Sequence, residues 1–180
     1  FDIITHLLVG SEGTLAFLSE FTMKTGKDYP FKASAMLYFN DIKEACRAVV
    51  AMKKGPVMGA ELLDKKSLES VNDPTGRGLT AVLTETMADT KEELYSQIEQ
   101  IEGILSAFKT AVPVKFTDKE EEYAPYWAIR SGIFPSVGGT RKPGTTTLIE
   151  DVAFHIEDLP EATADLQQLL EKHGYPDACI

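Results

Sequence analysis

The chain has 180 residues, of which 43% are hydrophobic, so it can bury one sizeable core with a small appendage. Its formal net charge is -10 and its isoelectric point is near 4.8. Because the phosphate backbone repels a strongly acidic chain, we expect no nucleic-acid partner. No apolar run approaches the roughly 20 residues that cross a bilayer, so we expect no transmembrane segment.

The two cysteines, Cys46 and Cys179, indicate neither a disulfide framework nor a metal site. They lie far apart in the sequence and follow no ligand spacing. His6, His155 and His173 are also scattered, without the i, i+4 pairing of a helical zinc site. We therefore expect no metal site. Two reduced cysteines favour a cytoplasmic compartment, with peripheral attachment to a membrane left open.

Residues 1–28 are predicted to form a strand, a tight polar turn and a second strand. Apolar runs flank the turn GSEG at residues 10–13, whose two glycines permit a sharp bend or a close backbone approach to another surface. Alternating apolar and polar residues continue the second strand to Thr25. Residues 26–30 are rich in turn formers, and we place a domain boundary after residue 28.

Residues 29–180 begin by alternating strands with helices. Strands are predicted over 33–39, 57–63, 79–86 and 112–116, and helices over 42–52, 65–71 and 91–109. Asn40 or Asp41 is expected to cap the first helix, and Thr90 the third. The order β-α-β followed by β-α-β is the split βαβ or ferredoxin-like pattern. We therefore predict an α+β domain with an antiparallel sheet covered on one face by helices.

The remaining residues are predicted to form a helix, a loop, a strand and a last helix. The sequence TDKE at 117–120 matches a capping box that opens a helix through Arg130. A loop over 135–145 and a strand over 146–154 follow, and the last helix is capped by Asp158 and ended by Gly174. This end of the chain resembles the start of another βαβ unit, and we expect the domain to be cut before that unit closes.

The predicted loop over 135–145 carries an unusual local charge. It contains Arg141 and Lys142 but no acidic residue, in a chain that is acidic overall. Because a guanidinium binds a carboxylate bidentately, these two cations and the nearby Arg130 are candidates to hold a small carboxylate. A solvated loop and a surface arginine whose stem covers Trp127 would give the same pattern. Pattern alone leaves both interpretations open.

Several segments share their residues with one known family. They are GSEGTL at 10–15, AELLD at 60–64, YWAIRSGIFP at 126–135, RKPGT at 141–145 and IEDVA at 149–153. In these segments the chain resembles FAD-linked oxidases, in the branch of D-2-hydroxyacid dehydrogenases similar to D-lactate dehydrogenase and glycolate oxidase. The resemblance implies that residues 1–28 end an FAD-binding domain. It also implies that residues 29–180 form a cap (substrate) domain that is incomplete at its C-terminus.

The resemblance also implies roles for single residues. Arg130 is implied to grip the carboxylate of a small 2-hydroxy acid, with Arg141 and Lys142 as helpers. The residues implied to contact FAD are Gly10, Ser11, Glu12, Gly13, Thr14, Leu15 and Leu18. Related enzymes place hydroxyl or lysine side chains near this arginine, but the matching positions hold Phe134 and Ile149, so those roles are not carried over.

The same resemblance implies a larger enzyme that oxidises a D-2-hydroxy acid, of D-lactate or glycolate type, to the 2-oxo acid. The main flavin loops are expected before Phe1 and the metal-ligand and base histidines after Ile180, so no catalytic residue is expected here. We therefore expect this part alone to be inactive and not to retain FAD. Its partner would be the flavin-binding domain of the same polypeptide, and a homodimer stays open. The alternative is a stand-alone ferredoxin-like domain that binds a small carboxylate without catalysis.

Overall fold

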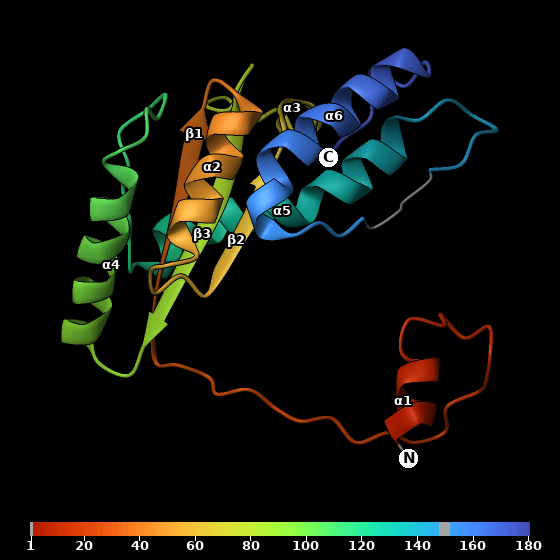
Figure 1. The fold of residues 1–180 in the computed structure, drawn as a ribbon, viewed down its shortest axis with the longest axis horizontal. Coiled ribbons are helices and arrows are strands. Elements are labelled where there is room, and N and C mark those ends of the chain that lie inside the picture. Colours follow the sequence, from red (N-terminus) through yellow and green to blue (C-terminus); the bar gives the residue numbers. More distant parts are fainter. Residues whose placement is uncertain (1, 148–151) are drawn as a thin grey trace.

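A short antiparallel sheet organises the body of the protein (Figure 1). The computed structural model describes residues 2–147 and 152–180. Strands β1 (Phe31–Phe39), β2 (Gly59–Leu63) and β3 (Thr80–Ala88) pair in the order β1-β3-β2, so that β3 is central. This mixture of helices with a small antiparallel sheet confirms the α+β class.

Helices cover both faces of this sheet, and the prediction that they cover one face is wrong. On one face lie α2 (Ile42–Met52) and α4 (Lys91–Leu105), packed against Leu37, Phe39 and Val82 among others. On the other face, α3 (Lys65–Ser70) and α5 (Glu120–Thr140) pack against Met36, Tyr38 and Leu83. Residues 33–39 of β1 are all buried. Such an unbroken buried run is typical of a strand covered on both sides, and the apolar sequence AMLYF already carried that signal.

The predicted strand over 112–116 does not form among the described residues, where its pairing with β1 is limited to a single bridge. Ser34 and Thr117 exchange two backbone hydrogen bonds of 3.0 Å. Continuing that register would place Pro113 opposite Tyr38, and proline has no N–H to donate. The Tyr38 carbonyl instead accepts from Ala111 N at 2.7 Å. The ferredoxin-like topology requires this fourth strand and therefore stays a prediction.

The predicted caps of α2 and α4 are confirmed. The Asp41 carboxylate accepts from Glu44 N, and the Thr90 hydroxyl accepts from Glu93 N, both at 3.1 Å. Each side chain satisfies an amide that has no partner inside its helix, which sets where that helix begins.

The capping box predicted at residues 117–120 is wrong. Helix α5 begins at Glu120, after Lys119, which makes no side-chain cap bond. The Thr117 hydroxyl instead accepts from Lys119 N at 3.3 Å and donates to Glu122 Oε2 at 3.0 Å. Because Thr117 is paired to β1 through its backbone, the chain cannot turn into a helix there.

Helix α5 continues to Thr140, so residues 135–140 are helical where the sequence predicted a loop. Pro125 and Pro135 each remove one helical hydrogen bond, but the fixed φ of proline is compatible with a helix. The side chains of Tyr126, Trp127, Ile129 and Ile133 pack onto the sheet. We infer that this tertiary packing outweighs the local cost of the prolines.

The predicted strand over 146–154 falls partly on residues 148–151, which lie outside the described residues. Its described parts, 146–147 and 152–154, are not in a strand. A 3-10 turn, η1 (Ile156–Asp158), then leads directly into α6 (Leu159–Lys172). Asp158 precedes α6 but makes no side-chain cap bond, whereas Gly174, with φ of +87°, ends the helix as predicted.

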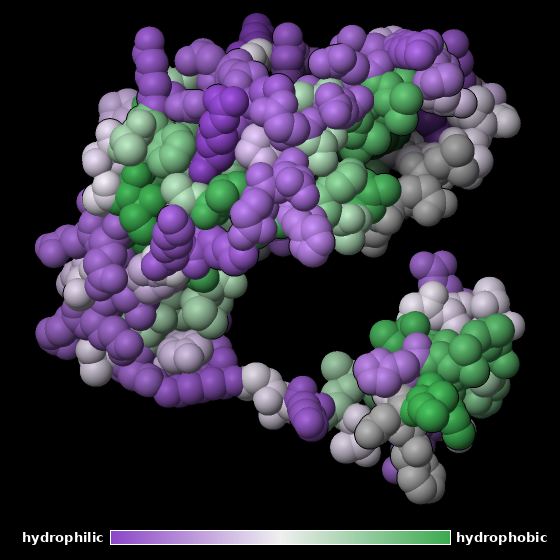
Figure 2. Space-filling model, in the orientation of Figure 1, coloured by the Kyte–Doolittle hydropathy of each residue, from purple (hydrophilic) through white to green (hydrophobic). Residues whose placement is uncertain are grey.

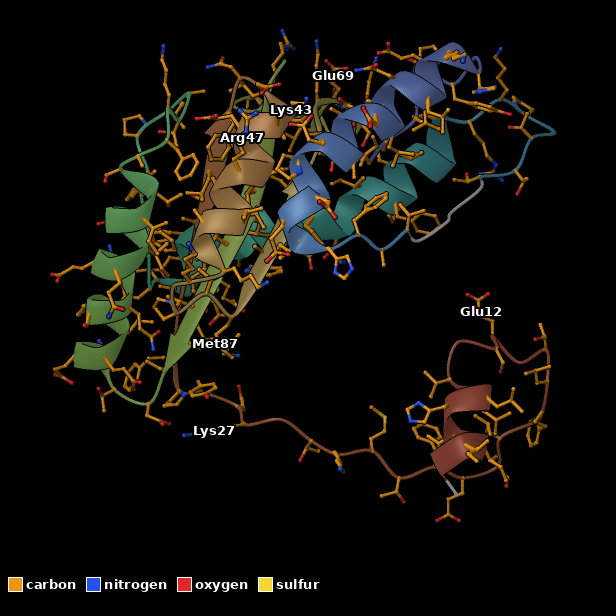
Figure 3. The ribbon with its side chains drawn as sticks, in the orientation of Figure 1. Glu12, Lys27, Lys43, Arg47, Glu69 and Met87 are labelled. Carbon is orange, nitrogen blue, oxygen red and sulfur yellow. The ribbon has the colours of Figure 1, made fainter. Side chains whose placement is uncertain are left out.

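Helix α6 lies against α2, outside the sheet (Figure 1). Lys43 and Arg47 of α2 (labelled in Figure 3) both pair with Glu161, and Lys53 Nζ lies 2.8 Å from Glu157 Oε1. The body therefore has a further helical layer on the α2 side.

The N-terminal segment contains a helix, α1 (Asp2–Leu8), and none of the strands predicted within residues 2–25. A strand is stabilised by hydrogen bonds to a neighbouring strand, and in the described chain no strand lies beside this segment. Helical hydrogen bonds are local, as in Val9 N to Thr5 O at 2.9 Å. The segment is set apart from the body (Figure 1). At its end, Lys27 forms an ion pair with Asp89, the residue that follows β3. The domain boundary at residue 28 stays a prediction.

Candidate functional site

Arg130 lies on α5 and reaches the edge strand β2. Its Nη2 atom is 3.4 Å from Glu61 Oε2 and 3.5 Å from Glu61 Oε1. The Arg130 side chain is 48% exposed and the Glu61 side chain 42% exposed. An ion pair this open is weakly stabilising, since water screens it. The guanidinium is therefore accessible to a ligand from solvent.

Three contacts fix where α5 carries Arg130. Trp127 Nε1 donates to Ser34 Oγ of β1 at 3.2 Å, Arg130 pairs with Glu61 of β2, and Ser136 Oγ donates to the Ser70 carbonyl of α3. In chain order these contacts run from one side of the sheet to the other. The helix therefore crosses the sheet, and Arg130 lies over its β2 edge.

Arg141 and Lys142 do not meet Arg130 in this structure. Arg141 closes the end of α5, donating to the Gly138 carbonyl and, through Nε at 3.0 Å, to the Thr145 carbonyl. Eleven residues of a helix rising about 1.5 Å per residue put Arg141 roughly 16 Å from Arg130 along the axis. A small carboxylate cannot span that separation. The structure therefore leaves Arg130 as the only one of the three placed over the sheet.

A second carboxylate, Glu85, lies under α5 in the row of the sheet next to Glu61. It is opposite Ser34 on β1 and Gly59 on β2, and Ser34 Oγ donates to its Oε2 at 3.4 Å. Burial raises the pKa of Glu85, while the charge of Lys32 and the Ser34 hydrogen bond oppose that shift. The sequence reasoning missed Glu61 and Glu85 as site residues. The available signal was a glutamate in the interior of a predicted strand, where this residue type is depleted.

The residues predicted to contact FAD form an exposed turn after α1. Gly10 and Gly13 have φ of +82° and +77°, as the sequence predicted for a tight turn, and Glu12 also has a positive φ of +48°. The turn is closed by Thr14, whose N and Oγ1 donate to the Ser11 carbonyl at 2.9 and 2.6 Å. Apart from the glycine itself and its two neighbours in the chain, no described atom lies within 4 Å of the place where a Cβ would stand on Gly10 or Gly13. Another surface can therefore approach this backbone closely.

The side chains around this turn fit one edge of a flavin. Leu15 and Leu18 are 59% and 53% exposed, and Figure 2 shows hydrophobic residues gathered on the N-terminal segment. Residues 8, 11–13 and 16–18 line a shallow hollow there. The apolar dimethylbenzene half of an isoalloxazine ring suits these leucines, whereas the Glu12 carboxylate (Figure 3) would repel a pyrophosphate. The chemistry of these side chains is therefore more compatible with the flavin ring than with the phosphates.

Among residues 2–147 and 152–180, no group of three or more His, Cys, Asp or Glu side chains could hold a metal ion. In the same residues, no helix has both the length and the apolar character needed to cross a membrane.

The family described as FAD linked oxidases, C-terminal domain, matches residues 30–180. The chain belongs to this family. The resemblance predicted from the sequence is thereby confirmed, and Arg130, Arg141 and Lys142 fall within the matched part of this FAD linked oxidase C-terminal domain. The turn at residues 10–13 lies before the matched part.

Two curated relatives of this FAD linked oxidase domain are redox enzymes by name. The chain is 27% identical over 161 residues to the protein named D-lactate dehydrogenase [cytochrome], mitochondrial, of Arabidopsis thaliana, a match over 88% of this chain. It is 26% identical over 144 residues to glycolate oxidase subunit GlcD of Escherichia coli (strain K12), over 77% of this chain. The matched regions are 28% of the length of each relative.

Proposed function

We propose that this chain is the substrate-binding part of an FAD-dependent oxidoreductase that converts a D-2-hydroxy acid, of D-lactate or glycolate type, into the 2-oxo acid. Membership of the FAD linked oxidase family supports the FAD-dependent class, and the names of the two relatives support the substrate type. When bound, FAD supplies the redox chemistry, and the protein supplies binding and orientation.

The observation that carries this proposal is the accessible guanidinium of Arg130 over the β2 edge of the sheet. Arginine binds a carboxylate through two parallel N–H donors, which fixes the orientation of the bound acid as well as its affinity. A 2-hydroxy acid held by its carboxylate has its hydroxyl-bearing carbon placed one bond away. Arg130 therefore orients the reacting carbon while the charge of the acid is neutralised.

Arg141 and Lys142 are proposed as helpers that act at a distance. They lie together at the end of α5 in a chain of net charge -10, which otherwise repels an anionic substrate. Local positive charge raises the concentration of an anion near a site and speeds its association. We expect these two residues to affect association more than the geometry of the bound acid.

The turn at residues 10–13, with Leu15 and Leu18, is proposed to contact the flavin ring along one edge. The remainder of the flavin site would belong to a flavin-binding domain elsewhere in the same polypeptide. The apolar side chains exposed around the turn, such as Phe17 at 93% exposure, support such a neighbour, because apolar surface of this kind is usually covered.

The full-length enzyme with Arg130→Ala tests the proposal. We expect kcat/KM for D-lactate and glycolate to fall by at least about 30-fold, since losing a charged hydrogen-bonded contact costs at least ~2 kcal/mol. Arg47→Ala on α2 is a matched control, because Arg47 is also an exposed arginine with a glutamate partner. Unchanged kcat/KM in the Arg130 variant would contradict the substrate role. Binding of D-lactate without flavin reduction in the wild-type protein would favour the non-catalytic carboxylate-binding domain.

A further inference from the structure

Glu61 is an acidic residue beside apolar side chains on one face of the sheet. It lies in the middle of β2, an edge strand, opposite Leu83 and on the same face of the sheet as Leu63. Around Glu61 that face carries an apolar cluster that includes Leu63 and Leu83, and its other acidic residue, Glu85, lies in the next row. Among the residues that the structure describes, Glu61 is the only acidic partner of Arg130.

The contact between the two side chains uses one corner of the guanidinium. A single nitrogen, Nη2, lies near both Glu61 oxygens, at 3.4 and 3.5 Å. Within residues 2–147 and 152–180, Nε and Nη1 of Arg130 have no hydrogen-bond partner. A guanidinium presents five N–H donors in a fixed fork, and each of the two Nη2 donors lies parallel to a donor of one neighbour, Nε or Nη1. A carboxylate on one of these two edges leaves the other edge able to take a second carboxylate bidentately.

Without a partner, the long Arg130 side chain would sample many rotamers and lose entropy on binding a ligand. The Glu61 contact restricts those rotamers before the ligand arrives. The backbone of Glu61 is held by the pairing of β2 with β3, so its carboxylate offers a fixed point to the longer arginine side chain. The cost is a second negative charge near the incoming acid, which solvent screens because Glu61 is 42% exposed.

We propose that Glu61 is a positioning residue that holds Arg130 so that the free edge of its guanidinium faces the carboxylate of the substrate. This inference rests on the proposed function of Arg130. A purely structural role is the competing explanation, because an inward-pointing charge on an edge strand blocks pairing with other strands, and the same pair helps to anchor α5. A structural role affects stability, whereas positioning affects KM.

Steady-state kinetics of the full-length enzyme with D-lactate and glycolate separates the two. We expect Glu61→Ala to raise KM roughly three- to fivefold, the factor expected from an exposed ion pair, with kcat nearly unchanged. Glu61→Gln should recover most of that loss, because its amide oxygen still accepts from Nη2. Thermal unfolding temperatures of both variants should match the wild type. Glu44→Ala, which removes a partly exposed glutamate 3.9 Å from Arg47, is the matched control and should leave KM unchanged.

Each other outcome overturns the inference in a distinguishable way. If Glu61→Ala leaves KM unchanged while Arg130→Ala impairs the enzyme, the positioning role is wrong and the proposed function stands. If Arg130→Ala also has no effect, the proposed function itself is wrong. A lower KM in Glu61→Ala would show that Glu61 competes with the substrate. A higher KM that Glu61→Gln does not recover, together with a lower unfolding temperature, would show an anchoring role only.

Discussion

Trp127 Nε1 on α5 donates a 3.2 Å hydrogen bond to Ser34 Oγ on β1. Ser34 Oγ in turn lies 3.4 Å from Glu85 Oε2 on β3, so one hydroxyl joins the helix to two strands. Arg130 is about one turn further along α5, so this contact also fixes its position over the sheet. These hydrogen bonds join residues that are distant in the sequence, and they determine where the candidate carboxylate-binding group lies.

Replacing either partner of this hydrogen bond should loosen α5. Trp127→Phe and Ser34→Ala should each lower the free energy of unfolding by about 1 kcal/mol beyond the effect on packing, the usual net value of one hydrogen bond. Urea unfolding of both single variants and the double variant measures the coupling between them. Additive effects would show that the hydrogen bond contributes nothing.

Glu85→Gln should change the pH dependence of stability. Because burial raises the pKa of Glu85 in the folded state, ionisation of this residue opposes folding. The penalty is absent below the unfolded pKa, near 4.3 for a glutamate, and complete above the folded pKa. The variant should therefore gain stability over the wild type between pH 4 and pH 7. Urea unfolding at both pH values checks this, with Glu99→Gln on the exposed face of α4 as control; an equal difference at the two pH values would contradict it.

Loss of a phenylalanine should destabilise the protein strongly in the core and hardly at all in the N-terminal segment. Phe39 is fully buried between α2, α4 and the sheet, whereas Phe17 is 93% exposed. Phe39→Ala should lower the free energy of unfolding by about 3–5 kcal/mol through lost burial and a cavity. Phe17→Ala should change it by less than about 0.5 kcal/mol, as is usual for surface substitutions. Denaturant unfolding of this chain measures both, and a large loss in the Phe17 variant would show that the N-terminal segment packs on the body.

The contribution of the Thr90 cap to the stability of α4 should be measurable by itself. Thr90→Ala removes the hydroxyl that accepts from Glu93 N and should cost about 1 kcal/mol of stability. Thr90→Ser keeps that oxygen and should stay close to the wild type. Thermal unfolding followed by circular dichroism compares the two variants. Equal losses would indicate that the threonine methyl group, and not the cap bond, stabilises the start of α4.

This chain alone should be colourless when purified. The turn at residues 10–13 with Leu15 and Leu18 offers one edge of a flavin ring, and Glu12 opposes the phosphates, so FAD should dissociate during purification. An absorbance spectrum between 350 and 500 nm tests this. A yellow protein with stoichiometric flavin would contradict it.

Features that depend on neighbours in the chain were predictable from the residues alone. Asp41 and Thr90 cap their helices, and Gly174 ends the last one, because each acts on amides or carbonyls a few positions away. The left-handed turn at Gly10 and Gly13 is local in the same sense. The family resemblance was also a property of short residue patterns, since each of them could be compared without knowing the fold.

Features that depend on distant partners were not predictable in this way. Pro135 predicts a loop until the packing of α5 on the sheet is known, and Pro113 opposes strand pairing only because it would face Tyr38. The residues after Gly13 alternate like a strand, but strand hydrogen bonds need a neighbour that the described chain does not place there. Arg130 was identified from the sequence, whereas its partner Glu61, 69 positions away, was not. Such pairings are determined by how helices and strands pack, because long-range contacts form only once the chain has closed on itself.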